Sequence, residues 1–343
     1  MKRALSVLLV LIFLLGCLNG CTDSAPTPKE KSFLSYFDTV ATVISYAGDD
    51  EARFNANCAA VEEIFIRYHK LFDIYHAYEG ISNLYTVNQM AGVAPVAVEK
   101  ELIDFLLYAK EIYTLTKGET NVMLGAVLSL WHECRSAAAG GVSRLPTESA
   151  LTEAAKHTAI ESLVIDKEAG TVFITDAAAS LDVGALGKGY AAERAAELLR
   201  ERGVKSYVLD VGGNLRAIGA KPDGSAWITG VTDPLGGTLA AKLSFASGSL
   251  VTSGDYKRYY VVDGKRYHHI IDKDTLYPAE HFVSVTVCTA DSGLADALST
   301  ALFCMTYEEG VTLLSSLTDT DALWITESGE IKMTDGMAQR LLP

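Results

Sequence analysis

The sequence predicts an α+β fold in which antiparallel or mixed sheets are flanked by helices. Several long patterns of helical periodicity occupy the first half of the chain, and short strand patterns dominate from residue 207 onward. Strands and helices do not alternate regularly, and this disfavours a Rossmann-type parallel sheet. No internal repeat of fixed period is present, and residues 33–343 are enough for one large domain or two modest ones.

The first 21 residues are predicted to be a lipoprotein signal peptide. Lys2 and Arg3 precede an uncharged apolar stretch, residues 4–15, that is too short to span a bilayer comfortably. Two Gly-Cys pairs follow, ending at Cys17 and Cys21, and either resembles the site at which bacterial lipoproteins are cleaved and acylated. Cys17 has the better preceding residues, and an ordinary secretory signal is the alternative. Residues 22–32 then form a tether, which predicts a domain lipid-anchored on the extracytoplasmic face of the membrane.

Periodicity and residue type define the elements of the domain. Residues 33–46 are rich in β-branched and aromatic side chains and predict one strand. Apolar residues at helical spacing predict helices over 51–72, 99–116, 122–133, 191–199, 290–303 and 307–317. Strands are predicted over 162–166, 171–175, 207–210, 215–219, 226–231, 239–245, 250–253, 259–262 and 283–288, with a closing strand pair. The small and polar residues 135–147 are expected to form a loop.

Charge and cysteine content exclude some functions. The formal net charge of −14 argues against a nucleic-acid partner, and it requires that any bound phosphate be met by local positive groups or a metal. Cys58, Cys134, Cys288 and Cys304 show no metal-binding spacing. They are either packing residues or include one disulfide.

Residues 181–190 form a candidate phosphate-binding turn. An apolar run that contains Asp182 is followed by a glycine-spaced turn, then by Lys188 and a helical pattern. Glycines allow close backbone approach to a ligand, and a helix N-terminus favours negative charge. Lys188 adds a full positive charge, although the spacing is not that of a Walker motif.

Other polar segments are ambiguous one by one. Gly212 and Gly213 end a strand, residues 252–256 place hydroxyls and a glycine at another strand end, and His268 precedes His269. Neighbouring side chains of a strand face opposite ways, so one histidine at most points into a given cleft. Asp296 and Thr300 lie four apart on a predicted helix and therefore share one face. A hard cation held by oxygen ligands and a carboxylate stabilised by the helix dipole are both compatible with that pair.

Taken in order, these segments resemble the ApbE family of FAD:protein FMN transferases. Upstream segments around residues 72–88 and 116–131 agree, so the resemblance covers about residues 33–330. It implies a single α+β domain that moves the FMN half of FAD onto a Ser or Thr hydroxyl of a target protein, releases AMP, and uses Mg²⁺. It further implies an extracytoplasmic acceptor among redox flavoproteins.

The resemblance also implies roles for individual residues. His269 would take the proton of the acceptor hydroxyl. Contacts with FAD would come from Tyr75, Thr120, Asn121, Asp182, Lys188 and Ile270. The Mg²⁺ ligands would be the backbone carbonyl of Ala185 and the side chains of Asp296 and Thr300.

The sequence departs from the family pattern at three places. The usual Met-Gly-Thr reads Phe37-Asp38-Thr39, and Asn121 stands where many members have Asp. After Asp272 the family often has Pro-x-Thr-Gly, where this chain has Lys273-Asp274-Thr275-Leu276. Two alternative functions stay open at this point. A Mg²⁺-dependent FAD pyrophosphatase would release FMN and AMP without an acceptor, and a flavin-binding lipoprotein would hold FAD without chemistry.

Overall fold

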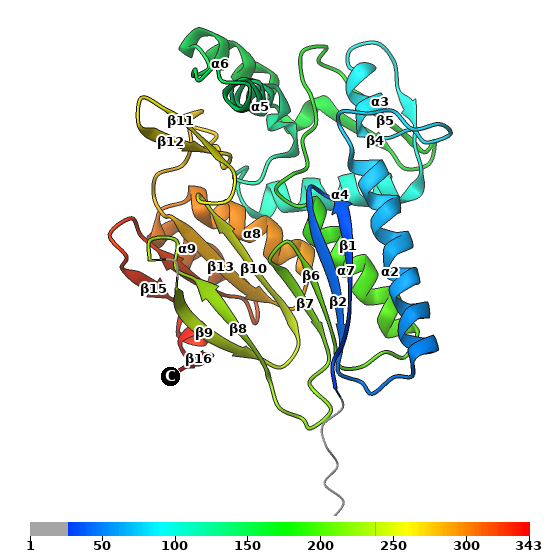
Figure 1. The fold of residues 1–343 in the computed structure, drawn as a ribbon. Helices are drawn as coiled ribbons and strands as arrows, with labels where there is room; N and C mark the ends of the chain where they lie inside the picture. Colours follow the sequence, from blue (N-terminus) through cyan, green and yellow to red (C-terminus); the bar gives the residue numbers. More distant parts are fainter. Residues whose placement is uncertain (1–26, 237) are drawn as a thin grey trace, which may run out of the picture.

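The fold is built on one eight-stranded sheet, described here from a computed structural model that covers residues 27–236 and 238–343 (Figure 1). Every pair of neighbouring strands in this sheet is antiparallel. The sheet order is β1 (Lys29–Tyr36), β2 (Thr39–Ser45), β6 (Tyr207–Val211), β7 (Asn214–Ile218), β10 (Gly248–Gly254), β13 (Ser284–Thr289), β14 (Asp321–Ile325) and β15 (Ile331–Met333). The predicted α+β class is therefore confirmed. The predicted signal peptide, with Cys17 and Cys21, lies outside the described residues.

Side chains of successive strand residues enter different cores because they alternate between the two faces of the sheet. In β6, Tyr207, Leu209 and Val211 belong to the core under the helices. Val208, between them, belongs to a second core on the opposite face. The helices of the first face are α2 (Glu51–Phe72), α4 (Lys100–Leu115), α7 (Gly187–Glu201) and α8 (Ser292–Cys304). The second face is covered by a three-stranded sheet of β16 (Leu341–Leu342), β9 (Leu239–Phe245) and β8 (Trp227–Thr232).

Smaller elements gather at one end of the main sheet, at the top of Figure 1. The hairpin of β11 (Tyr259–Val262) and β12 (Lys265–His268) packs against α5 (Gly125–Ala139) through an aromatic cluster around Trp131.

The remaining elements are α3 (Leu84–Gln89), α6 (Glu148–Ala154), α9 (Tyr307–Leu314), α10 (Asp335–Ala338), and the sheet of β3 (Val96–Ala97), β5 (Thr171–Ile174) and β4 (Leu163–Asp166). Three short 3-10 turns cover Val122–Leu124, Ala155–His157 and Ile160–Ser162.

The structure corrects several predicted elements. Residues 33–46 form two strands, because the backbone reverses at Phe37 and Asp38, which both have positive φ, 53° and 55°. Positive φ at both central residues is the geometry of a tight hairpin turn. The predicted loop after residue 135 begins as helix, since α5 continues through the alanines to Ala139. The helices α3 and α6 and the strand β12 are not predicted.

Two further observations complete the fold. The four cysteines of the domain are free and buried, so they are packing residues and none forms a disulfide. In the part of the chain that the structure describes, no helix is long and apolar enough to span a bilayer.

Candidate functional site

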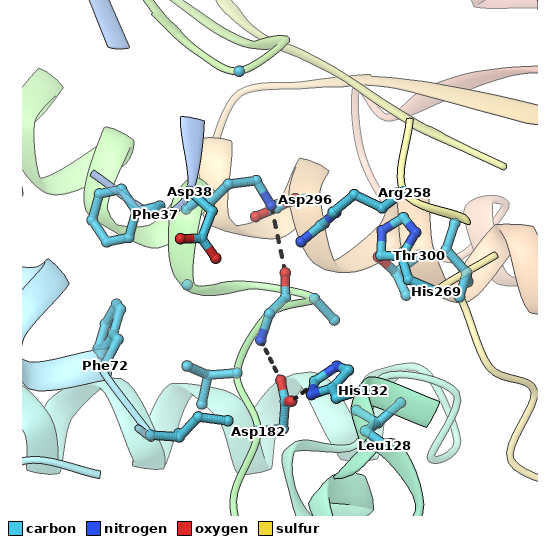
Figure 2. A pocket seen from close by; sticks show the side chains of 18 of the residues that line it. Phe37, Asp38, Phe72, Leu128, His132, Asp182, Arg258, His269, Asp296 and Thr300 are labelled. Carbon is cyan, nitrogen blue, oxygen red and sulfur yellow. Dashed lines mark hydrogen bonds and ion pairs between the residues drawn. The ribbon is translucent and has the colours of Figure 1, made fainter. Parts of the chain in front are cut away.

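A cavity of about 550 Å³ lies where the β1–β2 turn, the end of α2, the loop before α7 and the start of α8 meet (Figure 2). Its volume falls within the range of small-molecule and cofactor sites. Nine of the ten predicted site residues line it: Tyr75, Asn121, Asp182, Ala185, Lys188, His269, Ile270, Asp296 and Thr300. These residues come from segments far apart in the sequence, and the fold brings them together.

The crossing of α7 and α8 positions Asp296. This residue is only 3 % exposed, and its Oδ2 accepts a hydrogen bond from the backbone N–H of Gly189 at 2.8 Å. Its Oδ1 lies 3.8 Å from the Nζ of Lys188. Both contacts offset the cost of burying a carboxylate. A Cβ at Gly189 would overlap the carbonyl oxygen of Ser292 and the Cβ of Asp296, so the close crossing requires glycine.

The loop before α7 is held by its own polar groups. The Oδ1 of Asp182 accepts a hydrogen bond from the N–H of Gly184 at 2.9 Å, and the Nζ of Lys188 donates to the Gly184 carbonyl at 3.5 Å (Figure 2). Burial lowers the pKa of Lys188, and the nearby Asp296 opposes that shift. The loop therefore presents a lysine to the same space as Asp296.

The proposed Mg²⁺ ligands form a set of hard oxygen donors. Asp296, Thr300 and the backbone of Ala185 all line the cavity, and they supply a carboxylate, a hydroxyl and a carbonyl. No group of three or more His, Cys, Asp or Glu residues arranged to hold a metal occurs in residues 27–236 and 238–343. Mg²⁺ commonly takes one or two carboxylates and completes its shell with water and substrate phosphates. The donor set here fits such an ion.

His269 follows β12 and faces the cavity, whereas His268 does not line it. The Nε2 of His268 donates to the carbonyl of Ala279 at 2.9 Å, and its Nδ1 accepts from the N–H of Ile270 at 3.3 Å. These two bonds fix the backbone on either side of His269. The Nδ1 of His269 is buried and has no hydrogen-bond partner among the described residues. Burial, followed by the charges of Arg258 and Lys188, lowers the pKa of His269 to about 2.

Three cations that the sequence analysis missed also line the cavity: Arg135, Lys257 and Arg258. Across residues 27–236 and 238–343, no carboxylate lies within ion-pair distance of either arginine. Figure 2 shows Arg258 between Asp296 and His269. These residues supply local positive charge in a chain of net charge −14. Arg135 stands apart from every motif, and Lys257 and Arg258 follow directly after the segment 252–256, which was the one signal that could have indicated them.

A fourth missed residue is His132, on α5. Its Nδ1 lies 3.0 Å from the hydroxyl of Tyr75, and its Nε2 lies 3.9 Å from the Oδ2 of Asp182. The backbone turn that carries Tyr75 is fixed by Asp73, whose Oδ1 accepts from the N–H groups of Tyr75 at 2.7 Å and His76 at 3.0 Å.

Thr120 and Asn121, two predicted FAD contacts, use their side-chain polar atoms in hydrogen bonds with the protein backbone. Thr120 does not line the cavity: it is 2 % exposed, and its hydroxyl donates to the carbonyl of Ala297 at 2.9 Å. This position corrects the expectation that Thr120 faces the nucleotide. Asn121 lines the cavity, but its Oδ1 accepts from the N–H of Met123 and its Nδ2 donates to the carbonyl of Thr158, both at 2.9 Å.

Comparisons with known proteins agree with this geometry. The model of the ApbE family matches residues 37–324. An FAD:protein FMN transferase of Treponema pallidum is 32 % identical over 97 % of this chain and 94 % of its own length. One from Klebsiella pneumoniae is 29 % identical over 84 % of this chain and 88 % of its own. The crystal structure of the ApbE protein of Thermotoga maritima has a TM-score of 0.80 at 28 % identity, and covers 92 % of this chain and 100 % of that protein.

Proposed function

Because this chain belongs to the ApbE family, we propose that it is an FAD:protein FMN transferase, which moves FMN from FAD onto a Ser or Thr hydroxyl of a target protein. The observation that carries the proposal is the convergence of Asp182, Lys188, His269 and Asp296 on one cavity of about 550 Å³. Relatives that match nearly the whole chain bear the same activity in their names.

In the proposed reaction, the acceptor hydroxyl attacks the phosphorus of the FMN half of FAD. A bond forms between the acceptor oxygen and that phosphorus, and the pyrophosphate bond to AMP breaks, so that AMP leaves with the bonding electron pair. The hydroxyl proton passes to His269. A histidine that is unprotonated before the step is able to accept it, and general-base catalysis of this kind contributes about 10²–10⁴ in rate.

The cations around His269 serve both the substrate and the base. Arg258 and Lys188 lower the pKa of His269 in the free protein. An anionic pyrophosphate placed among these cations offsets their charge, and this raises the basicity of His269 when substrate is bound. Lys188 is held by the Gly184 carbonyl and Asp296 before the reaction, so it stabilises negative charge without reorganisation.

We assign the Mg²⁺ of the family to Asp296, Thr300 and the Ala185 carbonyl. When bound, the ion would neutralise the negative charge on the pyrophosphate oxygens. Asp296 keeps its contact with Gly189, and that hydrogen bond orients its carboxylate toward the cavity.

We further propose that the chain acts as a membrane-anchored protein with an extracytoplasmic acceptor. The support is the apolar segment at residues 4–15 and the two Gly-Cys pairs, all outside the described residues. Mass spectrometry of the mature N-terminus from membranes tests this point, because a diacylated Cys17 or Cys21 is expected and an unmodified N-terminus would contradict it.

The activity is tested by incubating the protein with FAD, Mg²⁺ and an acceptor domain that carries the family's Ser or Thr target motif. We expect release of AMP together with an acceptor heavier by one FMN. His269→Ala should retain FAD binding and lose transfer by about 10²–10⁴. The exposed His281 provides a matched control, His281→Ala, in which transfer should be unchanged.

Each other outcome selects a different function. AMP and free FMN with an unmodified acceptor would indicate a pyrophosphatase. Bound FAD with no AMP would indicate a flavin carrier. Unchanged transfer in His269→Ala would show that another group accepts the proton.

A further inference from the structure

We propose that His132 is a positioning residue that accepts a hydrogen bond from the hydroxyl of Tyr75 and so holds Tyr75 in place for FAD. The inference rests on the proposed function and on the FAD contacts of Tyr75 and Asp182 that the family resemblance implies. It adds a residue that carries no motif of its own. Figure 2 shows the imidazole of His132 beside the Asp182 carboxylate at the edge of the cavity.

The geometry gives Tyr75 one polar anchor. Its side chain is 58 % exposed, and His132, at 3.0 Å, is the sole hydrogen-bond partner of its hydroxyl among the described residues. The turn at Asp73 fixes the backbone of Tyr75 but not its ring. Without His132, the exposed ring is therefore free to leave the cavity wall.

The direction of the hydrogen bonds follows from the charge states. Burial and the nearby Asp182 raise the pKa of Tyr75, so its hydroxyl keeps its proton and donates. Burial lowers the pKa of His132 against the opposing charge of Asp182, so its Nδ1 is free to accept. In that neutral tautomer the proton sits on Nε2, which faces the Oδ2 of Asp182 at 3.9 Å.

Asp182 is held by the loop before α7 and lies next to His132. Its Oδ1 accepts from the N–H of Gly184 at 2.9 Å, and its Oδ2 faces His132. At 3.9 Å the Nε2 of a neutral His132 is too far from Oδ2 for a hydrogen bond, so the contact that positions Tyr75 is the one through Nδ1. The charged groups nearest to the ring of His132 are Asp182, Arg135 and Arg258.

Two substitutions separate the hydrogen bond with Tyr75 from the side of the imidazole that faces Asp182. In His132→Asn, the shorter amide lies near the position of the imidazole Nδ1 and is able to accept from Tyr75. In His132→Gln, the longer amide lies near the position of Nε2 and faces Asp182. His132→Ala removes both contacts. Glu133→Ala, at the next and exposed residue of α5, is the matched control.

The test is a titration of each variant with FAD in the absence of acceptor, monitored by the quenching of flavin fluorescence, together with steady-state KM and kcat. We expect His132→Ala and Tyr75→Phe each to weaken FAD binding about five- to tenfold, the usual effect of losing one hydrogen bond. The double variant, with both His132→Ala and Tyr75→Phe, should bind FAD no more weakly than the single variant with the lower affinity. His132→Asn should retain most of the affinity for FAD. In the His132 and Tyr75 variants kcat should change less than about twofold. Glu133→Ala should match the unmodified protein in both affinity and kcat.

Independent losses that multiply in the double variant would overturn the inference, as would unchanged affinity in His132→Ala. A fall in kcat without a change in affinity would overturn it as well, because that split indicates a role in the chemistry. If His132→Ala does not fold, as judged by thermal melting, the His132→Asn and Tyr75→Phe variants and their combination decide the coupling. Protein that binds FAD but transfers no FMN would reject only the proposed function, and protein that binds no FAD would reject both.

Discussion

At the scale of single residues, Asp296 has a structural role in addition to its proposed place in the metal site. Its carboxylate accepts from the N–H of Gly189 and lies beside Lys188. An alanine would leave the amide of Gly189 without an acceptor and Lys188 without its charge partner. Asparagine keeps an oxygen for Gly189 and removes the charge.

The two substitutions at Asp296 should therefore differ in stability and agree in activity. We expect Asp296→Ala to lower the free energy of unfolding by about 1–3 kcal/mol. We expect Asp296→Asn to fold nearly as well and to lose Mg²⁺-dependent AMP release. Thermal melts and AMP release at varied Mg²⁺ measure both effects, with the exposed Asp223→Asn as control. Mg²⁺-stimulated release in Asp296→Asn would remove Asp296 from the metal site.

The site residues that could be predicted from the sequence are those that belong to short local patterns. Asp182 and Lys188 flank a glycine turn, and Asp296 and Thr300 share a helix face. Arg258 and His132 occur without such a pattern, because only the tertiary fold brings them to the cavity. Thr120 was misplaced although it belongs to a local pattern. Its neighbour Asn121 lines the cavity, but the side chain of Thr120 turns into the core and donates a hydrogen bond to the carbonyl of Ala297 in α8.

At the scale of elements, the crossing of α7 and α8 sets the geometry of the cavity wall. Gly189 lies at the contact, where its missing side chain lets the backbone of α7 approach Ser292 and Asp296. The same glycine donates the hydrogen bond that orients Asp296. The distance between the two helices and the position of the carboxylate are therefore coupled.

Gly189→Ala should separate the two helices. Alanine usually favours a helix over glycine by about 1 kcal/mol, but overlap with backbone atoms should reverse the sign and cost about 1–3 kcal/mol. Transfer activity should fall together with the midpoint of thermal melting. Gly310→Ala in α9 is the control, because a Cβ added there would meet side-chain atoms of Leu302 and Trp324, at 3.1 and 3.2 Å, and not backbone atoms. A Gly189→Ala protein with unchanged melting and activity would show that the crossing tolerates a side chain.

Element boundaries were harder to predict than element types. The hairpin turn at Phe37 and Asp38 contains neither glycine nor asparagine, the residues that usually indicate such a turn, so residues 33–46 read as one strand. The end of α5 was missed because its alanines favour a helix without adding an apolar face. The short β12 is paired with β11 alone, and its pattern has no clear alternation.

At the scale of the whole molecule, three histidines link stability to pH. Burial lowers the pKa of His132, His268 and His269 below the ordinary value near 6.5. Below about pH 6.5 the unfolded chain binds protons at these positions that the folded chain does not bind. The free energy of unfolding is therefore fully retained above that pH and falls as the pH decreases below it.

His268 gives the clearest test of this link, since both of its ring nitrogens have partners only in the neutral form. Asp255, Arg266 and Glu280 are the charged groups that act on it. Between pH 6.5 and 5 the free energy of unfolding of His268→Gln should fall less steeply than that of the unmodified protein. The difference in slope should be up to about 1.4 kcal/mol per pH unit, which is the contribution of one proton. Urea denaturation at several pH values measures the slope, and the comparison at pH 8 gives the cost of the substitution itself. An unchanged slope would show that His268 does not bind its proton preferentially in the unfolded chain.

The first strand also determines how far the cavity stands from the beginning of the domain. β1 runs from Lys29 to Tyr36 (Figure 1), and Phe37 and Asp38 at its end line the cavity (Figure 2). Eight extended residues span roughly 25 Å at about 3.3 Å each. In the proposed membrane-anchored protein, this length adds to that of the predicted tether in the distance between the membrane and the reaction site. The proposed acceptor would have to present its hydroxyl at a matching distance, so the length of its own stalk would be a criterion for selecting partners.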